Sequence, residues 1–262
     1  MPTVPTFKNF LLEEEGPVAV FTSNRPEIMN AMNIDSNIDV IHFVEYLESA
    51  EHLRVAVITG AGDKAFIAGA DLNAVRAQSG VKSLQSKLRI SLAALENCSK
   101  PIIAAINGYA FGGGFELALA CDIRLVAENA MLGLPETGLG FIPGAGGTQR
   151  LSRIAGVGIA KDMILGGRTL SAQEAVQYGI AMKALPLENL MKEAKKLAGK
   201  MVLRGPIALN VGKKVINASM YTDPATGCTM ESLALAILFD SKDKLEGTSA
   251  FLEKRKPQFK GE

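Results

Sequence analysis

The chain has few of the residues that mark a secreted, metal-binding or membrane protein. Its 262 residues include three cysteines, Cys98, Cys121 and Cys228, which lie far apart and in no metal-ligand spacing. This usage argues against a disulfide scaffold, a zinc site and a secreted domain. No run of about 18 apolar residues is present, and the first 15 residues lack the charged start and apolar core of a signal peptide. We therefore expect a cytoplasmic protein without a membrane span.

Charge of one sign is not in excess either. Lysine and arginine together number 28, against 27 acidic residues. Such a chain has no global field to attract nucleic acid or an anionic membrane, so we expect neither as a partner, and any anionic ligand must be held by local groups. His42 and His52 are the only histidines, and neither stands beside a recognisable serine or cysteine nucleophile. A histidine-based triad is therefore not expected.

Glycine is abundant in one decisive place. Residues 107–122 read NGYAFGGGFELALACD, in which three glycines (112–114) lie between an apolar run typical of a buried strand (101–106) and a helix-forming run (115–120). Glycine disfavours helices, so three in succession at a helix entrance indicate an unusual backbone angle or a close approach by another group. The amides of a first helical turn can hold an anion or an oxyanion. Alternatively, the glycines form a tight turn and Glu116 complements the helix dipole.

Two further loops have similar features. After the predicted strand 53–59, the segment KAFIAGADL (64–72) contains the small residues Ala68 and Gly69, whose amides could face a ligand or lie in a packed bend. A later loop contains Glu136 and six glycine or proline residues before a predicted helix. Such a loop can cradle phosphate, but this one lacks the lysine of a Walker loop and the spacing of a dinucleotide fingerprint.

The order of the elements predicts an α/β protein with a helical appendage. Strands and helices alternate up to about residue 187, and helical composition dominates the remainder. We expect a catalytic domain over residues 1–189 and a helical region over 190–262, broken at 204–206 and 222–224. Further predicted elements are strands at 18–22, 122–127, 130–135 and 180–185, helices at 30–47 and 73–94, and a helix capped by Ser171 with Glu174 and ended by Gly179.

Taken together, these segments resemble the enoyl-CoA hydratase/isomerase, or crotonase, superfamily. The matching features run nearly from end to end in order and spacing. They are NRP (24–26) and NA (30–31), AFIAGAD (65–71), NGYAFGGGFELA (107–118), LPE (134–136), IPGAGGT (142–148) and FLEKR (251–255).

The resemblance implies a crotonase (ClpP-like) spiral of β-β-α units, with a helical carboxyl-terminal region that forms a homotrimer or a dimer of trimers. It implies an acyl-CoA thioester as substrate, with no metal and no cofactor beyond the coenzyme A of the substrate itself. Two backbone N–H groups form an oxyanion hole in the family, and the motif places them at Ala68 and Gly113.

The resemblance also implies the chemistry. Hydratases of the family carry two glutamates, which correspond to Glu116 and Glu136, whereas members that isomerise, hydrolyse or decarboxylate usually alter one of them. Water must lose a proton as it attacks the β-carbon, and the α-carbon must gain one, so a base and an acid must flank one water. Glu116 is expected to activate the water and Glu136 to supply the α-proton. The expected reaction is syn hydration of a trans-2-enoyl-CoA to a 3-hydroxyacyl-CoA.

Three alternatives to simple hydration remain. They are Δ3-Δ2 enoyl-CoA isomerisation, a crotonobetainyl-CoA-type hydratase, suggested by Phe115 where many members have cysteine, and a non-catalytic RNA-binding or partner-binding homologue.

Contacts with the CoA part of the substrate are expected near both ends of the chain. Glu27, where many members place a lysine, puts one phosphate contact in doubt. The residues expected to contact substrate or CoA are Arg25, Ile28, Ala68, Gly69, Ala70, Asp71, Leu72, Phe251 and Lys254, the last two from a neighbouring subunit.

Overall fold

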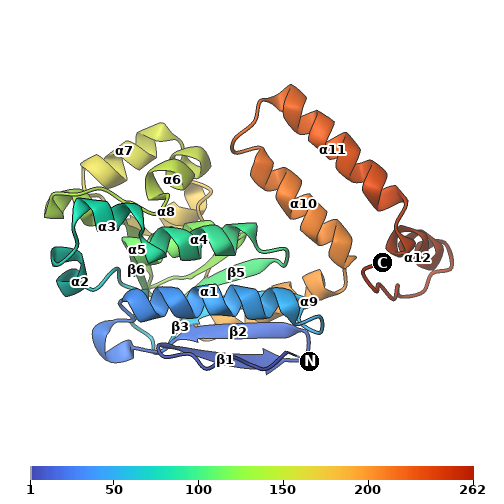
Figure 1. Cartoon of the computed structure of the whole chain (residues 1–262), viewed down its shortest axis with the longest axis horizontal. Coiled ribbons are helices and arrows are strands. Elements are labelled where there is room, and N and C mark those ends of the chain that lie inside the picture. The colour runs from blue at the N-terminus through green and yellow to red at the C-terminus, as the bar shows by residue number, and fades with distance from the viewer. Residues whose placement is uncertain (1) are drawn as a thin grey trace.

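A six-stranded sheet forms the centre of the computed structural model, which describes residues 2–262 (Figure 1). Four neighbouring pairs of its strands are parallel, and only the pair β1–β2 is antiparallel. Parallel sheets are covered on both faces, which explains why the inner strands are almost continuously apolar, whereas the edge strand β1 ends in three glutamates. The strands, in spatial order, are β1 (Phe10–Glu15), β2 (Val18–Ser23), β3 (Val55–Gly60), β5 (Ile102–Ile106), β7 (Ile123–Ala127) and β10 (Lys183–Leu185).

Two separate cores cover the two faces of this sheet. Ala56 and Ile58 of β3 join a core that also contains residues of helices α1, α4 and α5. Val55 and Val57 point the other way and pack with Leu190 of helix α9. Successive side chains of a strand point to opposite faces, so one short strand contributes to both cores.

A second, four-stranded sheet consists of β4 (Ala65–Ile67), β6 (Tyr109–Phe111), β8 (Met131–Gly133) and β9 (Leu170–Ser171), in that order. The first three strands are parallel and the last pair is antiparallel. Strands β4, β6 and β8 each follow a strand of the large sheet along the chain, and a helix comes next, in the order β3-β4-α2, β5-β6-α5 and β7-β8-η2; only β9 follows a helix instead. The predicted spiral of β-β-α units is therefore confirmed.

Four helices of the spiral, α1, α2, α3 and α8, begin at a polar residue whose side chain caps them. The Asn33 side chain accepts from the Ser36 amide at the start of α1, so this helix begins later than the predicted residue 30. The predicted capping box of Ser171 and Glu174 is present. The helices are η1 (Pro26–Ile28), α1 (Ile34–Ser49), α2 (Leu72–Arg76), α3 (Gly80–Leu84), α4 (Lys87–Asn97), α5 (Gly113–Ala120), η2 (Pro135–Leu139), α6 (Gly147–Ala155), α7 (Val157–Leu165) and α8 (Ala172–Gln177).

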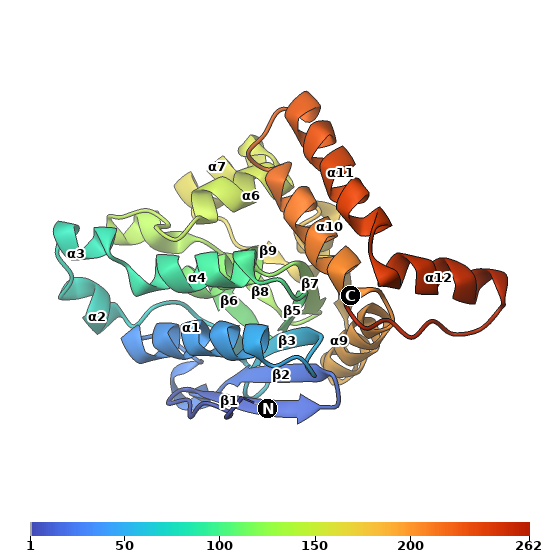
Figure 2. The ribbon, with the colours of Figure 1, turned by 45° about the vertical axis from the view of Figure 1, so that its right-hand side comes forward.

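The last quarter of the chain is helical, with breaks at Pro206 and Pro224 as predicted. Helix α9 (Leu187–Val202) crosses the predicted domain boundary after residue 189. Because it packs on the large sheet through Leu190, it belongs structurally to the spiral. The region that leaves the sheet comprises α10 (Pro206–Ala218), α11 (Pro224–Phe239) and α12 (Lys242–Leu252), as both views show (Figures 1 and 2). Among the helices of residues 2–262, none is both long and apolar enough to cross a bilayer.

Candidate active site

Two glycine-containing bends meet at the entrance of α5. Gly69, after β4, has φ +120°, and Gly112, before α5, has φ +50°, both in the region that favours glycine. A Cβ atom on Gly112 would lie 3.9 Å from Gly69 Cα and 3.2 Å from Glu136 Oε1. Gly112 therefore allows an unusual backbone angle, and it also lets a second loop and a carboxyl group come close. Both are the reasons that the sequence suggested for three successive glycines at a helix entrance.

Glu116 lies on the first turn of α5 and is almost completely buried. Its Oε1 atom accepts hydrogen bonds from the amides of Ala145 and Gly147, both at 2.8 Å. Its Oε2 atom accepts none from residues 2–262. One oxygen thus fixes the carboxylate while the other stays available, which is the arrangement that a general base requires.

The same contacts show what the glycine-rich loop before α6 does. The sequence suggested that such a loop could cradle a phosphate. Its amides at residues 145 and 147 instead bind a carboxylate of the protein, and a Cβ on Gly147 would lie 2.9 Å from Glu116 Oε1. The anion that this loop holds is therefore the Glu116 side chain, which comes from a helix 29 to 31 residues earlier.

Glu136 is the second buried acid, on η2. Its Oε2 atom is buried and has no hydrogen-bond partner. Burial disfavours the charged form and, together with the nearby Glu116 carboxylate, raises the Glu136 pKa from 4.5 to about 7. A buried carboxyl that lacks a partner and titrates near neutrality indicates a functional site, because it destabilises the fold without structural benefit.

The two carboxyl groups differ in their surroundings. Burial also raises the pKa of Glu116, but the Gly147 and Ala145 amides and the Arg150 charge oppose that rise. For Glu136 only its own backbone amide opposes the rise, and the Glu116 charge adds to it. This contrast favours the ionised form for Glu116 and the protonated form for Glu136, which agrees with the expected base and acid. The two protons titrate as a coupled pair.

The structure contradicts one of the two predicted oxyanion donors. The Ala68 N–H already donates to the Met29 carbonyl oxygen at 3.1 Å, so it has no bond left for a substrate. The Gly113 N–H, at the first position of α5, makes no hydrogen bond within residues 2–262, and its role stays a prediction. The Ala68 assignment fails because this amide is already hydrogen-bonded to a segment that is distant in sequence. The local motif does not reveal that bond.

Ala70 provides the free amide in the same loop. The Met32 N–H donates to the Gly69 carbonyl, and the Met32 carbonyl accepts from the Asp71 N–H, both at 2.8 Å, which forms a parallel bridge between Met32 and Ala70. In a parallel ladder, the residue bridged in this way directs its own N–H and C=O away from the bridging strand. The Ala70 N–H therefore points away from Met32, and it has no acceptor within residues 2–262.

The residues from the first third of the chain that are expected to contact CoA form one group at this loop. The segment that contains Arg25 and Ile28 is held against it by the Ala68–Met29 bond and the Met32 bridge. Ile28 and Leu72 are exposed, as a ligand-binding edge requires. Arg25 uses Nη1 on the Ala31 carbonyl at 2.7 Å, and the Asp71 side chain caps α2 by accepting from the Asn73 amide.

Two predicted contacts lie far from this group within one chain. Phe251 is on α12 and Lys254 follows it, and both views place α12 and α2 at opposite ends of the molecule (Figures 1 and 2). Phe251 is 83% exposed, which leaves it free to contact another molecule. A single chain does not bring this pair to the site, so the expectation that a neighbouring subunit supplies them stays a prediction.

Sequence reasoning missed the groups that hold Glu116. Neither Ala145 nor Arg150 was a candidate, although Arg150 stands in the TQRL segment at the start of α6. The usable signal was the position of Glu116 in an almost wholly apolar helix-forming run. A buried carboxylate needs donors, and the glycine-rich loop could supply backbone amides.

Comparisons with known proteins show to which family the chain belongs. The family model described as enoyl-CoA hydratase/isomerase matches residues 13–262. The chain is 41% identical to the short-chain-enoyl-CoA hydratase of Clostridium acetobutylicum, over 95% of this chain and 96% of the relative. It is 40% identical to the crotonyl-CoA hydratase of Syntrophomonas wolfei, over 97% and 98%. A crystal structure of enoyl-CoA hydratase from Bacillus anthracis superimposes with a TM-score of 0.93, at 41% identity over 97% and 100% of the two chains.

Proposed function

Because this chain belongs to the enoyl-CoA hydratase/isomerase family, we propose that it is a hydro-lyase that adds water reversibly to a trans-2-enoyl-CoA and forms a 3-hydroxyacyl-CoA. The observation that carries the proposal is the pair of buried carboxyl groups. Glu116 is anchored by two amides through one oxygen, and the pKa of Glu136 is raised to about 7. One group suited to accept a proton and another suited to donate one are what hydration requires.

The first part of the reaction uses the free oxygen of Glu116. A water molecule held by Oε2 gives up a proton to it as the water oxygen bonds to the β-carbon. The electrons of the carbon–carbon double bond move toward the thioester, whose oxygen gains negative charge. The Oε1 atom stays bound to Ala145 and Gly147, so the base does not rotate away from its water during the step.

The developing negative charge needs donors that are already in place. We assign them to the free N–H groups of Gly113 and Ala70, the latter replacing Ala68. Gly113 adds the positive end of the α5 dipole. Removing one such donor in other enzymes costs about 10²–10³-fold in rate. Glu136 then transfers its proton to the α-carbon. At this point Glu116 is protonated and Glu136 is ionised, and transfer of one proton from Glu116 to Glu136 restores the starting state.

Hydration of crotonyl-CoA tests the proposal. Loss of the enoyl thioester absorbance should depend on the enzyme, and Glu116→Gln and Glu136→Gln should each slow it by about 10²–10⁴-fold. In water enriched in ¹⁸O, the label should appear on the β-carbon of the product. Turnover of a 3-enoyl-CoA to the 2-enoyl form without label would instead identify an isomerase, and wild-type rates in either variant would refute the assigned roles.

We also propose that copies of the chain assemble through the carboxyl-terminal helices as a trimer or a pair of trimers. Large apolar side chains are exposed along α10, α11 and α12, among them Ile216, Leu233, Ile237, Phe239 and Leu252. Exposed apolar surface of this extent supports an interface. Light scattering after size exclusion should give three or six times the 27.8 kDa chain mass, and a monomer would overturn this proposal.

A further inference from the structure

The loop that binds Glu116 is itself held by a buried arginine. Arg150, on α6, is 8% exposed, and its Nη1 atom donates to the Ala145 carbonyl at 2.8 Å. The Ala145 amide donates in the opposite direction, to Glu116 Oε1. Ala145 is therefore fixed through both of its backbone polar groups, by the arginine on one side and by the carboxylate on the other.

The contact between the arginine and the loop is close. Gly146 has φ +104°, and a Cβ atom on it would lie 2.3 Å from Arg150 Nη1. No other residue type fits between the loop backbone and the guanidinium without displacement of one of them. The conformation of the loop and the position of Arg150 consequently depend on each other.

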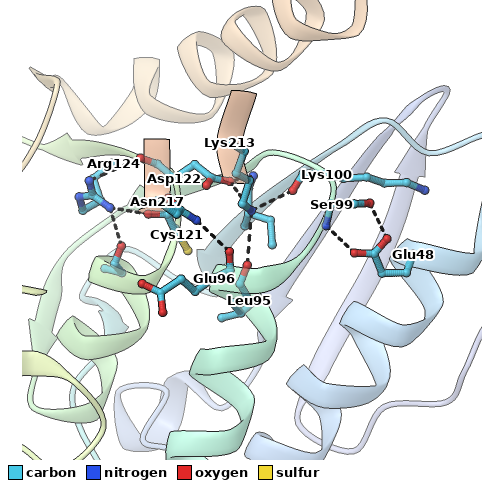
Figure 3. A network of polar contacts seen from close by, with 12 residues as sticks. Glu48, Leu95, Glu96, Ser99, Lys100, Cys121, Asp122, Arg124, Lys213 and Asn217 are labelled. Carbon is cyan, nitrogen blue, oxygen red and sulfur yellow. Dashed lines mark hydrogen bonds and ion pairs between the residues drawn. The ribbon is translucent and has the colours of Figure 1, made fainter. Parts of the chain in front are cut away.

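Glu96, at the end of α4, orients the guanidinium. Arg150 Nε and Nη2 donate to Glu96 Oε1 and Oε2 at 3.1 and 2.9 Å, a two-pronged contact that a planar guanidinium makes and a lysine cannot. The helical region supports Glu96 in turn. Asn217 of α10 donates to the Glu96 carbonyl at 3.1 Å (Figure 3), and the Tyr221 hydroxyl donates to Glu96 Oε1 at 3.3 Å.

We propose that Arg150, oriented by Glu96, is a positioning residue that fixes the loop of residues 145–147 and thereby the direction of the Glu116 carboxylate. The inference rests on the proposed role of Glu116 as the base. A reacting group must be held within about 0.5 Å of its productive position, and here the loop that does so has its own support. Arg150 does not touch the reacting atoms, because it acts through Ala145.

The charge of Arg150 has a second effect on the same group. It lowers the pKa of Glu116, against the effect of burial. Glu136 from η2 repels the Glu116 charge, and Glu96 from α4 pairs with Arg150. Loss of the Arg150 charge leaves two carboxyl groups without their cation, so ionisation of Glu116 requires a higher pH.

Three variants and one control separate position from charge. Arg150→Gln removes both the charge and the two-pronged contact. Arg150→Lys keeps the charge but loses the contact, and Glu96→Gln weakens the contact while Arg150 stays in place. The control is Arg153→Gln, because Arg153 also lies on α6 and donates to the Met220 carbonyl beside Tyr221, but it makes no hydrogen bond with residues 145–147.

Steady-state kinetics over a range of pH gives the first reading. We expect Arg150→Gln to lower kcat about 10–100-fold with KM within about 3-fold, and to move the acidic limb of the kcat profile to higher pH. Arg150→Lys should keep the limb near that of the wild type while its kcat stays lowered. Arg153→Gln should match the wild type in both respects. Equal losses in Arg150→Gln and Arg153→Gln, or a wild-type kcat in Arg150→Gln, would overturn the proposal.

Hydrogen exchange gives a reading that does not depend on turnover. In the unliganded proteins, peptides that cover residues 140–150 should exchange faster in Arg150→Gln and Glu96→Gln than in Arg153→Gln. Unchanged exchange there would refute the positioning role even if activity falls. An inactive wild-type protein would refute the hydratase function, while the exchange data still decide whether Arg150 holds the loop. If Arg150→Gln does not fold, Arg150→Lys and Glu96→Gln decide by the same readings.

Discussion

Lys213 of α10 donates a hydrogen bond to the Asp122 carboxylate over 2.8 Å, although 91 residues separate the two in sequence. The Lys213 side chain is 7% exposed and also donates to the Lys100 carbonyl at 3.2 Å (Figure 3). Asp122 accepts from the Ile102 amide at 2.7 Å. This pair attaches the carboxyl-terminal helices to the large sheet at the beginning of β5 and β7.

The first prediction concerns this pair. Asp122→Ala leaves a buried ammonium group without its counter-charge, which typically destabilises a protein by about 3–5 kcal/mol. Urea unfolding at fixed protein concentration measures the loss. The double variant Asp122→Asn with Lys213→Met removes both charges and should recover most of the stability. A single variant within about 1 kcal/mol of the wild type would show that the pair contributes little.

The second prediction concerns the pH dependence of hydration. Glu136 must be protonated to donate, so kcat/KM should decline as pH rises above about 7, the raised pKa of this group. Glu116 must be ionised, so an acidic limb should appear above pH 4.5, since burial raises its pKa from that value. Glu136→Gln should lose the alkaline limb in its residual activity, whereas the exposed Glu27→Gln should keep both. An alkaline limb that survives in Glu136→Gln would assign the donor elsewhere.

The third prediction links the same carboxyl group to stability. Its pKa is about 7 in the folded protein against 4.5 in an unfolded chain, so between these values the folded state binds more protons and stability falls as pH rises. Glutamine does not titrate. Thermal unfolding should therefore show Glu136→Gln close to the wild type at pH 5 and more stable at pH 8, by at most roughly 3 kcal/mol. Glu27→Gln is the matched surface control, and a gain that is equal at both pH values would contradict the assignment.

The fourth prediction distinguishes the amides of the oxyanion site. On binding of a saturated acyl-CoA, which cannot react, amide exchange at Ala70 and Gly113 should slow by about 10-fold or more, because both gain an acceptor. Exchange at Ala68 should change little, since its N–H is already bonded to Met29. Fragmentation to single residues after exchange provides the measurement. Protection at Ala68 with none at Ala70 would restore the original assignment.

Elements with strong local patterns were predictable from the sequence. The buried strand ending at Ile106 and the helix that follows the three glycines appear as expected, because apolar runs and glycine act locally. Strand β1 (Phe10–Glu15) was missed, since its second half is a run of glutamates and only its pairing with β2 makes it a strand. The predicted helix over 73–94 is divided into α2, α3 and α4, with Ser79 capping the second of them.

The same distinction between local and distant causes applies to the site. Glu116, Glu136 and Gly113 could be named because each stands in a short segment that matches a family motif, although the amides that hold Glu116 come from a loop 29 to 31 residues away. Ala68 could not be judged, because the register of a bridge between Met32 and Ala70 decides which amide is free. The pairing of Arg150 with Glu96 joins residues 54 positions apart, and no local pattern marks either as the partner of the other.

The single free oxygen of Glu116 has one more consequence. A flat enoyl group has two faces, and a base that is tied down through Oε1 can deliver oxygen to only one of them. The alcohol should accordingly leave the protein in one handedness. In the reverse direction, a racemic mixture of 3-hydroxyacyl thioesters would be resolved, with one mirror image dehydrated and the other left behind.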